Sequence, residues 1–189
     1  MNRLENWFCS TSFWRRVTQR RLLPWILSGA ELGDQLLEIG AGPGAATEEL
    51  RRCVTRVTSL EYEHAFAVGI AARPHGGVVR GDAAALPFAD GSFSSAIAIL
   101  VLHHLRSSEL QDRAFSEIYR VLRPGGVFLA FEIPDGWLQH AIHRNSAFVP
   151  VAPASAPARL TAAGFSQVAL DLRRGGFRLR AVRPPRGMI

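Results

Sequence analysis

Lysine is absent from this chain of 189 residues, and all 22 of its basic residues are arginine. When arginine replaces lysine along a whole chain, a bias in codon usage is a simpler explanation than a surface selected to bind a polyanion. The arginines are scattered, with local clusters only at Arg15, Arg16, Arg20 and Arg21, at Arg51 and Arg52, and at Arg173 and Arg174. The net charge of +6 aids contact with any polyanion, but it does not by itself indicate a nucleic-acid substrate.

Cysteine is scarce, and long apolar runs are missing. Cys9 and Cys53 have neither metal-ligand spacing nor a disulfide framework, which favours a reducing cytoplasm. No run approaches the roughly 18 apolar residues that a membrane-spanning helix needs. Glu5 comes too early for a signal peptide. With 48% hydrophobic and 20% charged residues, we expect one globular cytoplasmic domain over residues 1–189.

Strand-like and helix-like segments alternate from residue 35 onward. Strands are predicted at 36–40, 56–61, 77–82, 94–102 and 127–133, with helices over 45–52, 64–71, 108–122 and 155–163. This alternation predicts an α/β fold, a mostly parallel sheet with helices on both faces. The two closing strands, 165–172 and 176–184, are joined by "RRGG" and favour an antiparallel hairpin at the sheet edge.

The first 30 residues precede the first strand and are predicted to be helical from about residue 10, with an interruption near Pro24. Three of the four tryptophans, Trp7, Trp14 and Trp25, lie in this segment. We expect residues 1–30 to cover the substrate mouth of a core formed by residues 31–189. The arginines beside these aromatics would also suit contact with a membrane surface.

The stretch "LLEIGAGPGAAT" is an apolar run that breaks into glycines at Gly40, Gly42 and Gly44. A strand leading into a glycine turn and a helix is how open α/β sheets hold a nucleotide-like cofactor. Gly40, Gly42 and Ala45 also satisfy the dinucleotide pattern G-x-G-x-x-G/A. The turn alone therefore leaves the identity of the cofactor open.

Carboxylates at three strand ends narrow this choice. Glu38 stands two residues before Gly40, where it would repel a pyrophosphate but suit an ammonium and a sulfonium. Glu61 ends the second strand and can accept hydrogen bonds from both hydroxyls of a ribose. Asp82 ends the third strand and could accept from an adenine amino group. The three together favour S-adenosylmethionine over NAD.

In its motifs the chain resembles the class I S-adenosylmethionine-dependent methyltransferases of the small-molecule type. The matching segments, in order, are "LLEIGAGPG", "SLEYE", "GDAAALPFADGSF", "LVLHHL", "RVLRPGGVFLAFE" and "LTAAGF". They extend over about residues 36–184, most of the chain. The resemblance implies a Rossmann-like, seven-stranded sheet whose last strand is antiparallel.

The same resemblance implies a role for individual residues at the cofactor site. The methionine portion would be surrounded by Glu38, Gly40, Ala41, Gly42 and Gly44. Glu61 would hold the ribose, and Tyr62 would pack beside the adenine. Asp82 and the Ala83 amide would read the adenine edge, and the backbone near Ile99 would meet the amino-acid end of the cofactor.

Histidines are the candidates for chemistry on the acceptor, because a general base is needed only where the acceptor arrives protonated. His104 is the candidate catalytic residue, whereas His103 is expected to have a packing or hydrogen-bonded role. His140 and His143 lie three residues apart, but no carboxylate completes a ligand set at suitable spacing. We therefore expect no metal ion.

The acceptor is expected to be a small molecule, apolar or amphipathic. Enzymes that methylate base amino groups carry an Asn/Asp-Pro-Pro-aromatic run after the fourth strand, where this chain has "VLHH". Enzymes that methylate cytosine C5 need a cysteine there, and this chain has none at that place. Two alternatives stay open: an RNA or other nucleic-acid methyltransferase, and a non-catalytic regulatory domain that binds S-adenosylmethionine. The oligomeric state is not indicated.

Overall fold

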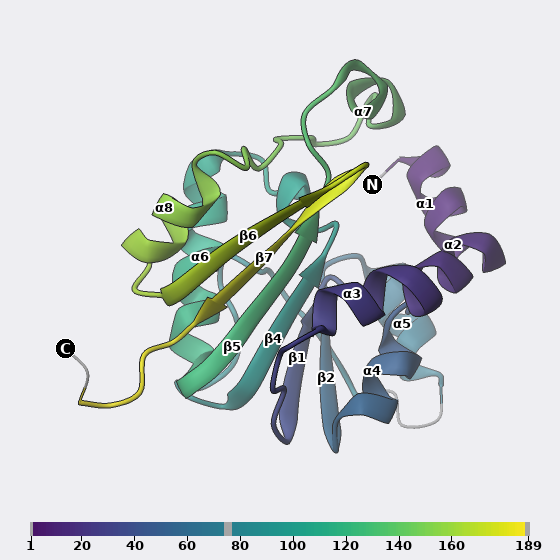
Figure 1. The fold of residues 1–189 in the computed structure, drawn as a ribbon. Helices are drawn as coiled ribbons and strands as arrows, with labels where there is room; N and C mark the ends of the chain where they lie inside the picture. The colour runs from purple at the N-terminus through teal and green to yellow at the C-terminus, as the bar shows by residue number, and fades with distance from the viewer. Residues whose placement is uncertain (1, 74–76, 188–189) are drawn as a thin grey trace.

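Seven strands form one sheet in the part of the chain that the computed structural model describes, residues 2–73 and 77–187 (Figure 1). They are β1 (Gln35–Ile39), β2 (Arg56–Glu61), β3 (Val78–Arg80), β4 (Phe93–Ile99), β5 (Leu122–Glu132), β6 (Ser166–Arg173) and β7 (Gly176–Val182). Across the sheet their order is β3-β2-β1-β4-β5-β7-β6. β7 runs antiparallel to both of its neighbours, and the other paired strands are parallel. The predicted Rossmann-like α/β fold with an antiparallel last strand is confirmed.

The strand order reverses between β1 and β4. From β1 the chain adds β2 and β3 on one side, and it then returns to add β4 and β5 on the other. Connections that leave the carboxyl ends of β1 and β4 therefore diverge, and a crevice opens at this edge of the sheet. The glycine turn after β1 and the "LVLHHL" segment after β4 both lie at this point.

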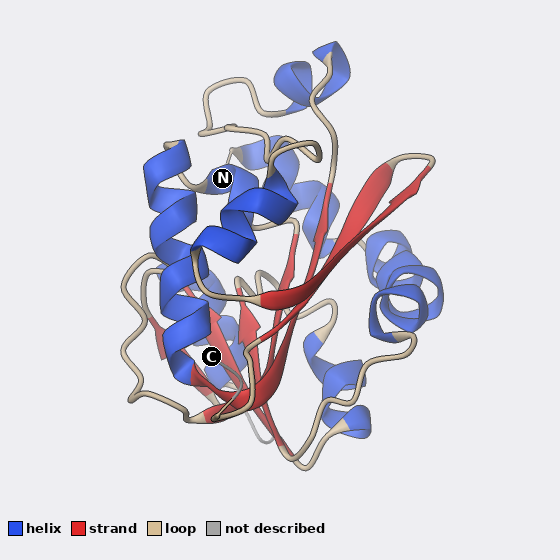
Figure 2. Ribbon diagram, turned by 60° about the vertical axis from the view of Figure 1, so that its left-hand side comes forward, coloured by secondary structure: helices blue, strands red, loops and turns tan. Residues whose placement is uncertain are grey.

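Alternating residues of the central strands face two separate cores. In β5, Val127, Leu129 and Phe131 belong to one apolar cluster, whereas Phe128 and Ala130 belong to the other. The first cluster is covered by α3 (Leu23–Leu27) and α4 (Thr47–Cys53), and the second by α6 (Ser108–Val121) and α8 (Ala156–Ala162). Figure 2 shows helices on both sides of the sheet, as the sequence predicts. α5 (His64–Ala71) packs against β2 and β3.

Helix α6 shows how sequence pattern sets one of these layers. Its buried Ala114, Phe115, Ile118 and Val121 recur at helical spacing and so form one apolar stripe. The Ser107 hydroxyl accepts from the Leu110 amide at 3.3 Å and caps the amino end. The helix covers 108–121, one residue short of the predicted range, because Leu122 already belongs to β5.

The N-terminal segment is helical from Arg3, earlier than predicted. It comprises α1 (Arg3–Ser10), α2 (Ser12–Val17), a π-helical turn η1 (Thr18–Leu22) and α3. The predicted interruption near Pro24 takes the form of this wider turn, in which the Leu23 amide donates to the Thr18 carbonyl five residues back. Proline has no N–H to donate to the carbonyl four residues back, and its ring collides with that carbonyl. The wider π turn before Pro24 moves this carbonyl away, so the helix can continue.

Leu23 and Ile26 of α3 are fully buried against the sheet. The segment thus combines a core helix, α3, with α1 and α2, which lie beyond the carboxyl edge of the strands (Figure 1). The irregular stretch after β5 contains α7 (Trp137–Ile142). Within residues 2–73 and 77–187, no helix is both long enough and apolar enough to cross a membrane.

Candidate active site

The glycine turn follows β1 and bends back over the end of β2. The amides of Gly40 and Ala41 both donate to the Leu60 carbonyl, at 2.8 and 3.2 Å. Gly40 has φ +66°, and a Cβ atom there would overlap the Val101 side chain. Only glycine combines that backbone conformation with so close an approach. Gly42 also has a positive φ, +53°, and faces open space, which leaves room for a ligand against its backbone.

Glu38 is buried at the end of β1. Its Oε2 accepts from the Thr47 hydroxyl at 2.8 Å and from the Ser59 hydroxyl at 2.7 Å. Burial raises the pKa of this carboxyl, and the two hydroxyls and nearby Arg51 oppose that effect. The carboxylate is thus fixed between β1, β2 and α4, in the wall of a cavity.

Glu61 is likewise buried, and it joins the end of β2 to the glycine turn. Its Oε2 accepts from the Gly42 amide at 2.7 Å, and its Oε1 accepts from the Glu63 amide at 2.8 Å. Each carboxylate oxygen can accept more than one hydrogen bond, so Glu61 can still receive two hydroxyls of a ligand. It also sets the position of the Gly42 backbone.

Tyr62 and Asp82 are exposed at the same edge. The Tyr62 side chain is 65% exposed and therefore free to lie against a planar ring. Asp82 Oδ1 accepts from the Ala84 amide at 2.8 Å, which caps the turn after β3, and Ala83 beside it is buried. This turn-capping bond occupies only one of the two Asp82 oxygens.

Two cavities meet at this edge of the sheet. The larger, about 730 Å³, lies over the ends of β2 and β3. The smaller, about 420 Å³, lies between the glycine turn, α1 and α7. Both are lined by Ile39, Gly40, Gly42, Leu100 and His104. We call them the adenosine cavity and the acceptor cavity, after the two groups that the sequence leads us to expect at this edge.

Nine of the ten residues predicted to bind the cofactor line these two cavities. The adenosine cavity contains Gly40, Gly42, Glu61, Tyr62, Asp82 and Ala83, and the acceptor cavity contains Glu38, Gly40, Ala41, Gly42 and Ile99. Gly44 lines neither cavity. It has φ +79°, and a side chain there would collide with the Arg73 guanidinium behind the turn. The structure therefore gives Gly44 a packing position rather than a cavity position.

The segment after β4 contributes residues that the sequence analysis did not single out. Leu100 has φ +57°, a strained conformation for a branched side chain, and its amide donates to the Phe131 carbonyl at 2.9 Å. Val101, Leu105 and Arg106 follow it into the adenosine cavity. Nothing in the local sequence marks Leu100, because its conformation is imposed by the neighbouring strand β5.

The two histidines of "LHHL" form most of a short 3-10 turn, η2 (Leu102–His104), held by Glu132 at the end of β5. Fully buried Glu132 accepts from the amides of Val101 and Leu102, at 3.0 and 2.8 Å, and binds His103 Nδ1 at 2.5 Å. His103 is thus hydrogen-bonded and packed, as expected. His104 is half-buried, lines both cavities, and has Nδ1 at 3.2 Å from the Ala147 carbonyl.

Burial, together with neighbouring His103, lowers the pKa of His104 to about 4. His104 is therefore a neutral imidazole at physiological pH. Because a carbonyl oxygen only accepts, Nδ1 carries the ring proton and Nε2 carries the lone pair. His104 can thus accept a hydrogen bond at the junction of the two cavities.

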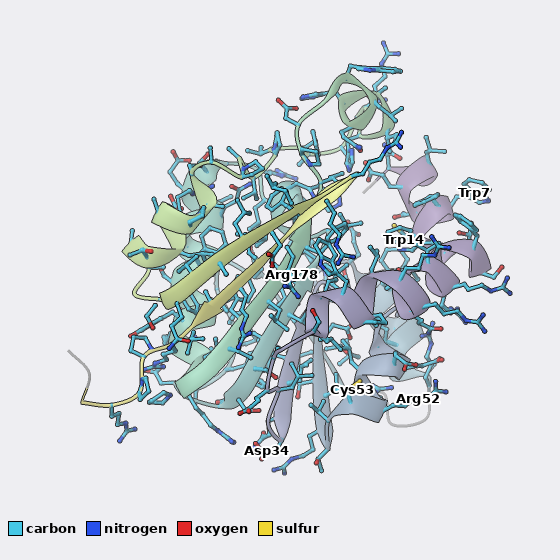
Figure 3. The ribbon with its side chains drawn as sticks, in the orientation of Figure 1. Trp7, Trp14, Asp34, Arg52, Cys53 and Arg178 are labelled. Carbon is cyan, nitrogen blue, oxygen red and sulfur yellow. The ribbon has the colours of Figure 1, made fainter. Side chains whose placement is uncertain are left out.

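The N-terminal helices close the acceptor cavity on the side away from the sheet. Its lining includes Leu4, Trp7 and Phe8 of α1 and Trp14 of α2. Phe8 and Trp14 pack with their ring centroids 5.2 Å apart, and Trp7 and Trp14 are labelled on these helices in Figure 3. Most of the cavity wall is apolar. Cys9 also lines it, but burial raises the pKa of this thiol to about 11, so it is not a ready nucleophile.

The strand order, the crevice at its reversal and the glycine turn after β1 place the domain in the class of Rossmann-like nucleotide-binding folds. Residues 37–130 match the family described as Methyltransferase domain. The chain belongs to this family of class I methyltransferases, whose cofactor is S-adenosylmethionine.

Relatives of known name support the same family. The chain is 36% identical over 120 residues to the demethylmenaquinone methyltransferase of Beutenbergia cavernae, covering 63% of this chain and 46% of that protein. It is 35% identical over 126 residues to a sterol 24-C-methyltransferase of Gibberella zeae, covering 62% of this chain and 31% of that protein. The chain thus spans about half the length of the first relative and about a third of the length of the second.

The fold is similar to that of a chain solved in complex with the Haloferax volcanii Trm112 methyltransferase activator. The TM-score is 0.77, with 98% of each chain covered and 17% sequence identity. At that identity the similarity shows the shared fold alone. It includes nearly the whole chain, and so extends beyond the residues matched by the family.

Proposed function

We propose that this chain transfers the methyl group of S-adenosylmethionine to a small acceptor that is apolar or amphipathic. The observation that carries the proposal is the meeting of the two cavities at Gly40, Leu100 and His104. One cavity has the polar edge that suits an adenosine, and the other has the apolar wall that suits an uncharged ligand. A sulfonium at their junction would present its methyl group to the second cavity.

In this proposal the cofactor lies across the carboxyl ends of β1, β2 and β3. Glu61 accepts from the ribose hydroxyls, Tyr62 covers one face of the adenine, and Asp82 with the Ala83 amide reads its edge. The methionine portion lies along the glycine turn and the end of β4, among Glu38, Gly40, Ala41, Gly42, Gly44 and Ile99. Gly44 acts there indirectly, by letting the turn pack on Arg73.

The apolar character of the acceptor is supported by the α1, α2 and α7 side chains around the smaller cavity. It also agrees with the names of relatives whose acceptors are a quinone precursor and a sterol. We propose that residues 1–30 serve as cover for a core formed by residues 31–189, with α1 and α2 over the acceptor. The free thiols of Cys9 and Cys53 support a cytoplasmic location.

Methyl transfer is an in-line displacement. A bond would form from the acceptor atom to the methyl carbon as the sulfur–methyl bond breaks, with its electron pair left on sulfur to give S-adenosylhomocysteine. A proton carried by the acceptor atom would leave to water. The sulfonium is already an activated leaving group, so the protein mainly supplies proximity and alignment. We propose that His104 aligns the acceptor by taking a hydrogen bond on Nε2.

A transfer assay tests the proposed function. Methyl-labelled S-adenosylmethionine is supplied with one of three acceptors: demethylmenaquinone, an organic-solvent lipid extract, or total RNA. Label is expected in one of the two apolar samples, and calorimetry is expected to show binding of S-adenosylmethionine but not of NAD. Label in RNA alone, with a steep dependence of RNA binding on salt, would instead establish a nucleic-acid methyltransferase. Cofactor binding without transfer to any sample would favour a regulatory domain.

Replacement of His104 by alanine is expected to lower kcat by about 10²-fold, the loss that a misaligned substrate can cause. The cofactor affinity should change little, because the Glu61 and Asp82 contacts are untouched. His64→Ala is the matched control, an exposed histidine that lines neither cavity. Equal kcat values for the two variants, measured by label transfer, would remove His104 from the reaction.

A further inference from the structure

Three histidines converge beneath the acceptor cavity, although the sequence separates them. His103 and His104 belong to η2, and His143 directly follows α7. One ring nitrogen from each lies within 4.8 Å of those of the other two. The ring centroids are 4.3 Å apart for His103 and His104, and 5.1 and 5.4 Å from these rings to that of His143. All three line the acceptor cavity.

Each of these rings is oriented by an oxygen on its Nδ1 atom. His103 Nδ1 meets Glu132 Oε2 at 2.5 Å, His143 Nδ1 meets the Gln139 carbonyl at 2.7 Å, and His104 Nδ1 meets the Ala147 carbonyl at 3.2 Å. Carbonyl and ionised carboxylate oxygens only accept hydrogen bonds, so each Nδ1 carries the proton. In the neutral form of each ring Nε2 carries the lone pair, and among the described residues none of these three atoms makes a hydrogen bond.

Histidine ligands of metal ions also have an oxygen hydrogen-bonded to the ring nitrogen that does not bind the metal. A metal-binding histidine generally donates its other N–H to a carboxylate or a backbone carbonyl, which fixes the ring and its tautomer. The Glu132–His103 pair is a carboxylate–histidine pair of this kind, and the other two rings use backbone carbonyls. His103 and His143 are 2% and 7% exposed, so the lone pairs are shielded from bulk water except through the cavity.

A buried carboxylate supplies the countercharge. Glu5 of α1 is 4% exposed, and its Oε1 lies 3.8 Å from His143 Nε2. It also accepts hydrogen bonds from the Asn2 amide at 2.7 Å and from Ser146. A dication held by the three rings would gain from this nearby buried carboxylate.

We propose that His103, His104 and His143 bind one divalent transition-metal ion through their Nε2 atoms. Three imidazoles suit Zn²⁺, which takes three protein ligands and keeps a fourth position open in catalytic sites. The expectation of no metal from the sequence rested on ligand spacing along the chain, and the fold supplies a set that this spacing does not show.

Because all three histidines line the acceptor cavity, an ion held by them would turn its open position toward that cavity. If the chain is the methyltransferase proposed above, an oxygen or nitrogen of the acceptor would occupy that position, next to the transferred methyl group. The alignment assigned to His104 would then act through the ion, with all three histidines contributing. This second step depends on the proposed function, but ion binding itself does not.

Titration of the metal-stripped full-length chain with Co²⁺ tests the site without any methyl transfer. One Co²⁺ per chain is expected, with the intense visible bands of a tetrahedral ion, and Zn²⁺ should displace it. His104→Ala and His143→Ala should each remove the bands. His140→Ala is the matched control, because His140 is an exposed histidine on α7 that binds Asp135 at 2.8 Å instead.

A variant of a residue that only positions a ligand keeps the test valid if the histidine variants fail to fold. Glu132→Gln keeps the shape of the side chain but removes the charge behind His103, and it should weaken Co²⁺ binding by about 10- to 100-fold, as changes in such outer partners do. No tetrahedral Co²⁺ spectrum with the unmodified chain, or equal loss of the bands in His140→Ala, would overturn the site. The three rings would then be only a packed wall with Phe148. Calorimetry with S-adenosylmethionine on the same samples reports cofactor binding separately, so failure of the metal site and failure of the proposed function are distinguishable.

Discussion

Removal of residues 1–10 is expected to reduce methyl transfer by at least about 10²-fold, a loss typical of a misplaced substrate, and to leave the affinity for S-adenosylmethionine unchanged. The deleted helix, α1, supplies Leu4, Glu5, Trp7, Phe8 and Cys9 to the acceptor cavity. It supplies no residue to the adenosine cavity. Glu38, Ala41 and Ile99, which we assign to the methionine portion, also line the acceptor cavity, but they belong to β1, the glycine turn and β4, which the truncation retains. The truncation therefore removes acceptor contacts and keeps every proposed cofactor contact.

The truncation stops before Thr11, whose hydroxyl accepts from the Trp14 amide at 3.1 Å and caps α2. Helix α3, which is part of the core, is also retained. Label transfer to the best acceptor of the panel and calorimetry with S-adenosylmethionine are the two measurements. Full activity of the truncated chain would show that α1 is not needed over the acceptor.

Two aromatic residues provide a matched pair within the same segment. Trp7 and Phe13 are both 66% exposed, but only Trp7 lines the acceptor cavity. Trp7→Ala should raise the KM for the apolar acceptor, and Phe13→Ala should not. Equal effects would indicate that the exposed aromatics act together as a surface, for example against a membrane, instead of as a cavity wall.

Replacement of Glu61 by alanine is expected to weaken binding of S-adenosylmethionine by about 1–3 kcal/mol, or roughly 5- to 150-fold. Two losses combine in this variant. The ribose hydroxyls lose their acceptor, and the amides of Gly42 and Glu63 lose the bonds that hold the turn at 2.7 and 2.8 Å. Calorimetry gives the affinity.

A thermal melt without cofactor shows how much of this loss comes from a loosened turn. Glu61→Gln is the milder variant, because its amide oxygen can still accept one of the two backbone hydrogen bonds, whereas its NH2 group can accept none. Glu31→Gln, at an exposed residue before β1 that lines neither cavity, is the control. Unchanged affinity in Glu61→Ala would mean that the ribose is held elsewhere.

The sequence was enough to predict which candidate cofactor residues lie together. Glu38, Gly40, Glu61 and Asp82 each stand at the end of a strand or in the turn that follows it. The carboxyl ends of parallel strands meet at one edge of the sheet, so residues at these positions are brought together by the topology alone. Local pattern was therefore enough to predict that they lie together, and Gly44 of the same turn packs against Arg73.

For the acceptor side, the sequence led to the expectation that residues 1–30 cover the substrate mouth, but not to the set of segments that form the cavity wall. Its walls come from α1, α2, η2 and α7, which are joined by no periodic pattern and meet only through tertiary contacts. Asn2 donates to the carbonyls of Ile142 and Arg144, and Ser146 donates to Glu5, across about 140 residues of chain. The convergence of His103, His104 and His143 depends on the same contacts and on Glu132.

The sequence by itself determined the order of strands and helices, the glycine turn and the carboxylates at the strand ends, because hydrophobic periodicity and glycine conformation are local properties. Only the tertiary structure decided that Pro24 follows a π turn inside a continuous helix, that Leu100 is held at a positive φ, and that three histidines share one cavity wall. These features arise where segments distant in the chain constrain one another, and no single stretch of sequence encodes them.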